Sequence, residues 1–118
     1  MVKVVKFGGS SLADAEQFKK VRAIVESDSA RRYVVASAPG KRNAEDTKVT
    51  DMLYNCYSKA AKGADIDEPF DGIKQRFTEI ISGLGIDFSL DSEFDIIKSA
   101  FIHKAGKDYA ASRGEYLN

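Results

Sequence analysis

The chain has 118 residues, of which 43% are hydrophobic and 31% are charged, a composition typical of a folded globular domain. Eighteen basic and eighteen acidic residues cancel, so net charge gives no reason to expect nucleic acid or an anionic membrane as a partner. No apolar stretch approaches the ~20 residues of a membrane-spanning helix. The single Cys56 cannot form an internal disulfide, which is typical of a reducing compartment, so a cytoplasmic location is predicted.

The first predicted element is a β-branched strand over Val2 to Phe7, followed by two glycines and two serines at positions 8–11. A strand, a glycine turn and a helix start together form an arrangement that binds anions, because consecutive backbone N–H groups can converge on one phosphate oxygen. Lys6 adds a positive charge near this point. The pattern is neither a Walker A loop nor a G-x-G-x-x-G fingerprint. It predicts a phosphate site, and the alternative is a tight turn that binds nothing.

A helix is predicted next, starting near Ser11 to Asp14, with one of these two residues as its cap. A second strand over Arg32 to Ser37 would then pair in parallel with the first, giving a β-α-β unit with a right-handed crossover and two buried strands. A polar loop over 39–46 follows at the carboxyl end of this strand, where open α/β sheets bind ligands. The helix face expected to cover the sheet comprises Phe18, Val21, Ile24 and Val25.

Helical periodicity dominates the rest of the chain. Further helices are predicted to begin near Thr47 to Thr50, at Glu68-Pro69, after a turn-rich stretch from Asp87, and at Lys107 or Asp108. The predicted fold class is therefore α/β, with parallel strands and a mostly helical remainder.

Three segments in order carry a family resemblance. Residues 6–12 (KFGGSSL) resemble the opening signature of the aspartokinases, members of the amino acid kinase family. Residues 34–41 and 47–53 resemble the second strand and loop of that family, and residues 112–117 resemble its Gly-Glu helix motif. The resemblance implies the N-terminal, amino-acid-binding part of an αβα sandwich over residues 1–118. The nucleotide-binding half and the regulatory ACT domains would lie beyond it.

The resemblance also implies an activity. Aspartokinases transfer the γ-phosphoryl group of ATP to the side-chain carboxylate of L-aspartate, toward lysine, threonine and methionine, with Mg²⁺ bridging the phosphates. We expect a homo-oligomer in the full-length enzyme and no metal ligand from this chain. The chain alone, whether a shortened form, a proteolytic fragment or a split gene product, is expected to be inactive.

The family pattern assigns site residues at matching positions. Lys6 would be catalytic, since its ammonium can neutralise charge on the transferring phosphoryl group. Substrate contacts would come from Ser37, Thr50 and Glu115, with Thr50 preferred over Thr47 although the loop is longer than in many members. The alternatives are a solvated Lys6, hydroxyls that only cap helices, and a solvated Glu115. Phosphate contacts are assigned to Lys6, Phe7, Gly8, Gly9 and Ser10.

Two other functions stay open at this point. One is a family member that acts on glutamate, acetylglutamate or a nucleotide. The other is a non-enzymatic module that binds a small anion or a partner protein.

Overall fold

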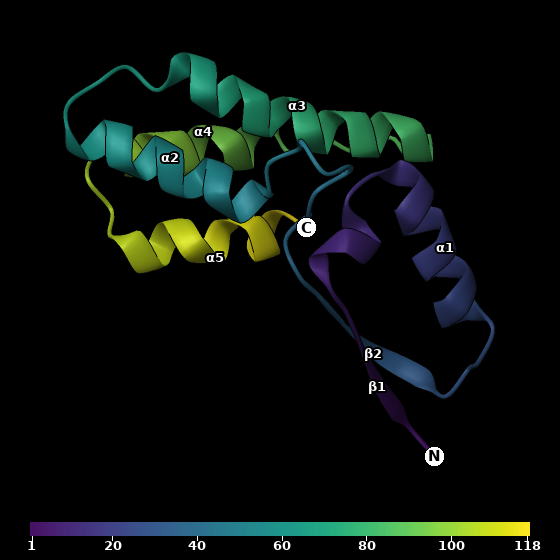
Figure 1. The fold of residues 1–118 in the computed structure, drawn as a ribbon. Helices are drawn as coiled ribbons and strands as arrows, with labels where there is room; N and C mark the ends of the chain where they lie inside the picture. The colour runs from purple at the N-terminus through teal and green to yellow at the C-terminus, as the bar shows by residue number, and fades with distance from the viewer.

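A computed structural model describes all 118 residues of the chain. The order of elements is β1 (Lys3–Phe7), a 3₁₀ turn η1 (Gly9–Leu12), α1 (Ala15–Glu26), β2 (Arg31–Ala36), α2 (Val49–Ala61), α3 (Asp67–Leu84), α4 (Asp91–Ile102) and α5 (Lys107–Leu117). Figure 1 shows β1, β2 and α1 projecting from a body made of the other four helices, and the molecule measures 50 × 30 × 26 Å. The predicted order of strands and helices is confirmed.

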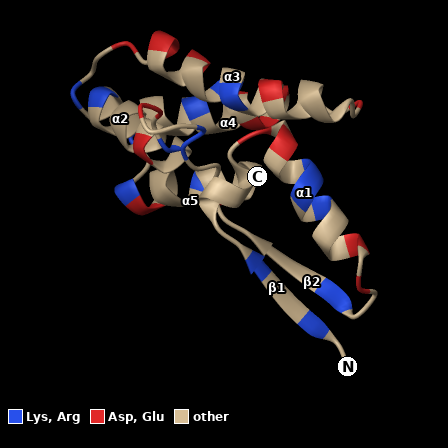
Figure 2. Ribbon diagram, turned by 45° about the vertical axis from the view of Figure 1, so that its right-hand side comes forward, with Lys and Arg blue, Asp and Glu red and all other residues tan.

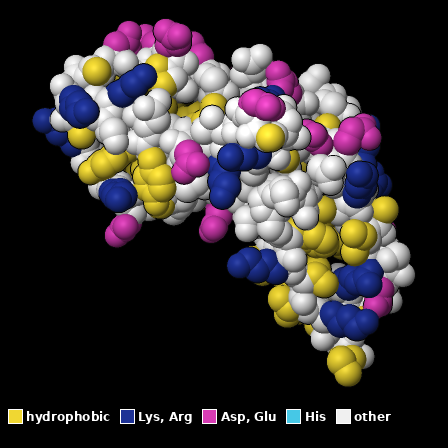
Figure 3. Space-filling view, viewed as in Figure 1, with side chains coloured by type: hydrophobic (Ala, Val, Ile, Leu, Met, Phe, Trp, Pro, Cys, Tyr) yellow, Lys and Arg dark blue, Asp and Glu magenta, His cyan; other side chains and the backbone are white.

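β1 and β2 form a parallel two-stranded sheet, as predicted. Val4 lies opposite Tyr33 and Lys6 lies opposite Val35, so these four side chains share one face, here called the open sheet face. All four are exposed, Val4 to 67% and Tyr33 to 62%. The prediction of two buried strands is wrong, because a single helix covers one face of the sheet and no layer covers the other. Figure 3 shows hydrophobic and basic side chains together on the surface of this unit.

α1 begins beside the strand pair, after the short 3₁₀ turn. Its cap is Asp14, the second of the two predicted candidates, whose carboxylate accepts the Gln17 N–H at 3.0 Å. No α1 residue is fully buried. The face expected to cover the sheet is half-buried at Phe18, Val21 and Val25, and exposed at Ile24.

The hydrophobic core lies in the helical body. Phe70 of α3 meets Phe94 and Phe101 of α4 edge-on, with ring centroids 6.4 and 6.3 Å apart. No helix combines the length and apolar character that a membrane crossing needs. The core residues are Val49, Leu53, Cys56, Ala60, Ile66, Phe70, Ile73, Phe77, Leu90, Phe94, Ile97, Phe101, Ala110 and Leu117.

α5 joins the two parts of the molecule. It packs along α2, and Gly114 lies against Ala38, where an added Cβ atom would come within 2.6 Å of the alanine Cβ. The side-chain amide of Asn118 donates a hydrogen bond of 2.6 Å to the carbonyl of Ser37. The end of α5 is thereby fixed beside the carboxyl end of β2.

Candidate functional site

The β2–α2 loop is the centre of the candidate site. Its residues 38–40 are buried although they belong to no helix or strand. The Pro39 carbonyl accepts the Val49 N–H at 3.0 Å, and the Gly40 N–H donates to the Gly9 carbonyl at 2.8 Å. The loop therefore connects the start of α2 to the glycine turn that follows β1.

The two backbone segments touch directly, and this close contact is possible because both positions are glycine. A Cβ atom on Gly40 would lie 2.6 Å from the carbonyl carbon of Gly9 and 2.8 Å from the Ser10 nitrogen. A Cβ atom on Gly9 would lie 3.0 Å from the Ala38 oxygen. Neither glycine has a positive φ, so close approach rather than a left-handed backbone explains the residue type.

A cavity of about 510 Å³ opens where the two segments meet the end of α5. Five residues selected from the sequence line it together: Gly9, Ser10, Ser37, Thr50 and Glu115. The other lining residues are Ala38, Pro39, Gly40, Lys41 and Lys48.

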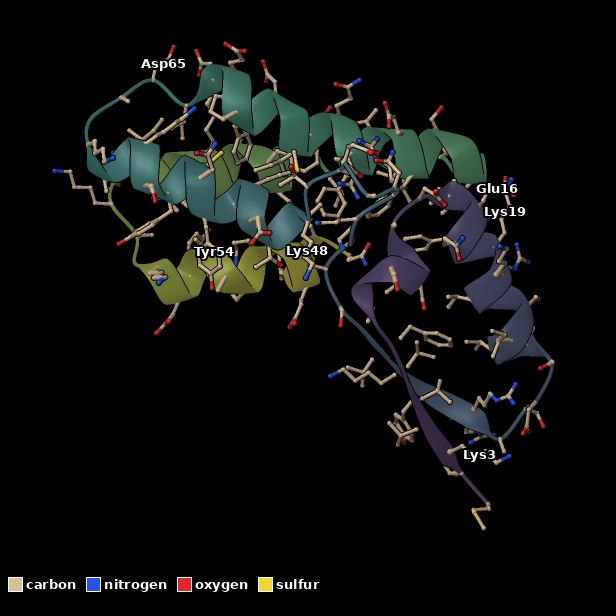
Figure 4. All side chains as sticks on the ribbon, in the orientation of Figure 1. Lys3, Glu16, Lys19, Lys48, Tyr54 and Asp65 are labelled. Carbon is tan, nitrogen blue, oxygen red and sulfur yellow. The ribbon has the colours of Figure 1, made fainter.

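The charged groups of the cavity suit an amino acid. Lys41, Lys48 and Glu115 form no ion pair within the chain. Lys48 precedes the first residue of α2, and Figure 4 shows it where that helix begins. The N–H groups of Thr50 and Asp51 donate no hydrogen bond within the chain, so the positive end of α2 is available to an anion. Two cations, a helix N-terminus and one carboxylate can together bind carboxylates and an ammonium group.

Comparison with curated sequences gives one family. Over 89 residues the chain is 47% identical to aspartokinase 3 of Bacillus subtilis, covering 75% of this chain and 20% of that protein. It is 32% identical over 118 residues to the bifunctional aspartokinase/homoserine dehydrogenase of Haemophilus influenzae, covering 90% of this chain and 14% of that protein. The chain thus spans a fifth or less of the length of these relatives. No protein-family model matches it.

Solved structures agree. Aspartate kinase from Clostridium acetobutylicum matches with a TM-score of 0.94 and 51% identity, over 98% of this chain and 27% of that one. This chain is an aspartokinase homologue. E. coli aspartokinase III, solved with aspartate and ADP, shares the fold at a TM-score of 0.70 and 24% identity, over 99% of this chain and 27% of that one. The family resemblance and the α/β fold predicted from the sequence are both confirmed.

Three of the residues predicted to contact phosphate in this aspartokinase homologue do not line the cavity. They are Lys6, Phe7 and Gly8, which directly precede the lining residue Gly9. Lys6 is exposed on the open sheet face. Phe7 accepts the Ser37 N–H at 3.1 Å through its carbonyl, and Gly8 caps the 3₁₀ turn. Lys6 therefore faces the side of the sheet that no element of this chain covers.

Three basic residues in or under the site, Lys41, Lys48 and Arg76, were not among the predicted site residues. Lys41 belongs to the polar loop over 39–46, and Lys48 lies within the stretch from Thr47 to Thr50 where a helix start was predicted, which was the available signal. Arg76 of α3 is 3% exposed. It falls on the same helical stripe as Ile73, Phe77 and Ile80, and a charged residue on an apolar stripe indicates a buried partner.

Arg42 and Asp46 form a paired unit within the β2–α2 loop. Two guanidinium nitrogens donate to the carboxylate at 2.7 and 3.1 Å, and the Arg42 backbone N–H donates at 2.9 Å. The Arg42 guanidinium holds the pKa of Asp46 well below its usual value. Arg42 also donates to Glu79 of α3 at 3.1 Å. These bonds fix the loop conformation from its solvent side.

The residues of the cavity fit the anionic part of a nucleotide. The N–H groups of Gly9 and Ser10 donate no hydrogen bond within the chain, and Lys41 and Lys48 supply positive charge. The chain contains no group of three or more His, Cys, Asp or Glu placed to hold a metal ion. Glu115 is the one carboxylate that lines the cavity.

Proposed function

We propose that this chain forms the amino-acid-binding part of an aspartate kinase, the N-terminal portion of a longer enzyme. That enzyme would transfer the γ-phosphoryl group of ATP to the side-chain carboxylate of L-aspartate, giving 4-phospho-L-aspartate toward lysine, threonine and methionine. The observation that carries the proposal is the cavity in which Ser37, Thr50 and Glu115 meet the glycine turn. The aspartokinase relatives support the same reaction.

Binding of the amino acid would use opposite charges at two places. Glu115 accepts hydrogen bonds from the substrate ammonium, while the free N–H groups at the start of α2 and the hydroxyls of Ser37 and Thr50 donate to its carboxylates. Lys41 and Lys48 add attraction for the two negative charges. An oxygen of the substrate's side-chain carboxylate is then held toward the glycine turn.

Phosphoryl transfer needs positioning and charge neutralisation more than covalent help from the protein. The substrate oxygen forms a bond to the γ-phosphorus while the bond to the bridging oxygen breaks, and ADP carries that electron pair away. Gly9 and Ser10 would donate N–H groups to the phosphates. Lys6 would bring its ammonium over the transferring group from the open sheet face.

Mg²⁺ would reach the site with the nucleotide phosphates and neutralise part of their charge. One lining carboxylate does not make a metal cage, and Glu115 is assigned to the substrate ammonium, so this chain would supply no ligand to the ion.

The direct test is hydroxylamine trapping of an acyl phosphate, using the full-length protein that carries this sequence, with ATP, Mg²⁺ and L-aspartate. We expect aspartate hydroxamate to form. Glu115→Gln should raise the KM for aspartate about tenfold or more, because it removes a charged hydrogen-bond acceptor, and should leave the KM for ATP within about twofold. Glu16→Gln, on the exposed face of α1, is the matched control and should change neither constant.

Lys6 and Lys3 form a second matched pair on one strand. Lys6→Met should lower kcat about a hundredfold and leave aspartate binding intact, since its charge acts on the transition state. Lys3→Met removes an exposed ion pair with Asp28 at the other end of β1 and should leave kcat unchanged. Turnover of glutamate in place of aspartate would correct the substrate. No amino-acyl phosphate from any amino acid would reject the kinase and leave an anion-binding module.

A further inference from the structure

Arg76 lies beneath the candidate site and bonds to three separate stretches of backbone. Its Nη1 donates to the Thr47 carbonyl at 2.9 Å. Its Nη2 donates to the carbonyls of Ala13 and Gly40, at 3.1 and 2.7 Å. One side chain from α3 thus holds the segment that follows the glycine turn and both ends of the β2–α2 loop.

Two of the three carbonyls, those of Gly40 and Thr47, belong to or directly precede a residue that lines the cavity. Gly40 lines it directly and donates its N–H to Gly9. The Thr47 carbonyl precedes Lys48 and the open N-terminus of α2. Holding these carbonyls therefore sets the distance between the glycine turn and the first turn of α2.

The bonding pattern of the guanidinium favours this role over simple packing. Arg76 is buried, and its Nε has no hydrogen-bond partner, which lowers stability. Its one ion-pair partner, Asp46, is 3.4 Å away and is bonded mainly to Arg42. The strongest contacts of the side chain are the carbonyl hydrogen bonds that shape the loop.

We propose that Arg76 is a positioning residue, which fixes the spacing between the glycine turn and the N-terminus of α2 and so sets the affinity of the cavity for its amino acid. The effect on affinity rests on the proposed function, whereas the effect on the loop does not. Arginine is required because the two Nη atoms of its fork reach carbonyls from three segments, and a lysine ammonium offers a single nitrogen.

Amide hydrogen exchange tests the positioning role without relying on turnover. In the full-length protein, Arg76→Lys should speed exchange at the Gly40 and Val49 amides about tenfold and leave the amides of α4 unchanged. Ile73→Val is the matched control, because it lies one turn earlier on α3 and is fully buried in the helical core. It should speed exchange through the helical body without singling out these two amides.

Steady-state kinetics tests the consequence for binding. Arg76→Lys should raise the KM for aspartate about tenfold while Ile73→Val leaves it unchanged. Equal effects of the two variants on this KM, or equal exchange at Gly40 and in α4, overturn the proposal. If the wild type does not act on aspartate but the exchange result is as expected, the proposed function fails and the positioning of the loop stands.

The wild type provides a second measurement if Arg76→Lys does not fold. The Nη protons of Arg76 should exchange about tenfold more slowly than those of the exposed Arg22, and their chemical shifts should move when L-aspartate is added. Shifts that do not move in a protein that binds aspartate overturn the proposal.

Discussion

Gly40 and Gly9 show how single residues shape the candidate site. Their backbones touch and are joined by a hydrogen bond, which leaves no space for a side chain on Gly40 and little space for one on Gly9. A glycine turn is usually explained by its freedom to adopt unusual φ angles. Here the φ angles are ordinary, and the requirement comes from a second segment 31 positions later in the chain.

Gly40→Ala should therefore destabilise the protein. The new methyl group would meet backbone atoms of Gly9 and Ser10 at under 3 Å, and such overpacking costs about 1–3 kcal/mol. The free energy of unfolding in urea measures the effect. Gly72→Ala is the control: its Cβ atom would meet only the Met52 methyl, at 3.4 Å. In a helix this exchange should stabilise by about 0.5–1 kcal/mol. Equal effects at the two positions would contradict this account of Gly40.

At the scale of elements, the β2–α2 loop combines buried backbone with an outer pair of charges. Asp46 accepts hydrogen bonds from the Arg42 side chain and backbone, and Arg42 also donates a hydrogen bond to Glu79 of α3. The loop is fixed from both sides, by Arg76 beneath and by Arg42 above.

The Arg42–Asp46 pair should make stability depend on pH. The pKa of Asp46 is lowered in the folded protein, so its carboxylate stabilises the fold above about pH 4, the usual pKa of an aspartate. That stability is lost as pH falls from there toward the folded-state pKa. Asp46→Asn should lower the unfolding free energy by about 1 kcal/mol at pH 7, allowing for solvent around Arg42. The difference should shrink as pH falls below about 4. Thermal unfolding across pH measures it.

Asp87→Asn is the control for this experiment, because Asp87 is exposed and forms no ion pair. A difference between Asp46→Asn and wild type that persists unchanged at low pH would exclude the charge as its cause.

Periodicity and turn chemistry predicted the elements well, because they act over a few residues. Pro69 lies in the first turn of α3, and α5 begins at Lys107 directly after Gly106. The loop conformation was not predictable in this way. It depends on Gly9 and on Arg76, which bonds to Gly40 across 36 positions, and no local pattern encodes such contacts.

The candidate site was predicted only in part, because some of its residues belong to local motifs and others are placed by long-range contacts. Parallel pairing brings the turn after β1 to the end of β2, and the two assigned residues Ser10 and Ser37 line one cavity there. The motif at Glu115 added the third side of the cavity. Lys48 was not predicted as a site residue, because it lines the cavity only through its position at the start of α2. Lys6 does not line the cavity, because the strand alternation puts it on the open sheet face, and its catalytic role stays a prediction.

On the scale of the whole molecule, apolar surface is distributed unevenly. The helical body buries a continuous hydrophobic core and exposes single residues such as Ile96 and Ile102, whereas the strand unit exposes Val4, Tyr33 and Val35 on one face. Figure 2 shows that the strands carry Lys and Arg and no acidic residue. This combination of exposed apolar and basic groups is unusual for a free surface.

The 118-residue chain in isolation should therefore self-associate through the open sheet face. We expect its weight-average mass in sedimentation equilibrium to rise above that of one chain at micromolar concentration. Replacing Val4 and Val35 together by Thr keeps β-branched residues in the strands and should weaken association about tenfold. Ile102→Thr, an exposed position on α4, should have no effect. A chain that stays monomeric at all concentrations would contradict the expectation.

The location of the core also affects how the chain folds as it leaves the ribosome. Every residue of the hydrophobic core lies between Val49 and Leu117, so the first 48 residues emerge before the helical body against which α1 packs. At about 5–20 residues per second, the β1–α1–β2 segment would wait roughly 4–14 s for α5. During this time its valine-rich strands are exposed to other nascent chains. Within these 118 residues, the N-terminal segment is thus the part that stays exposed longest during synthesis.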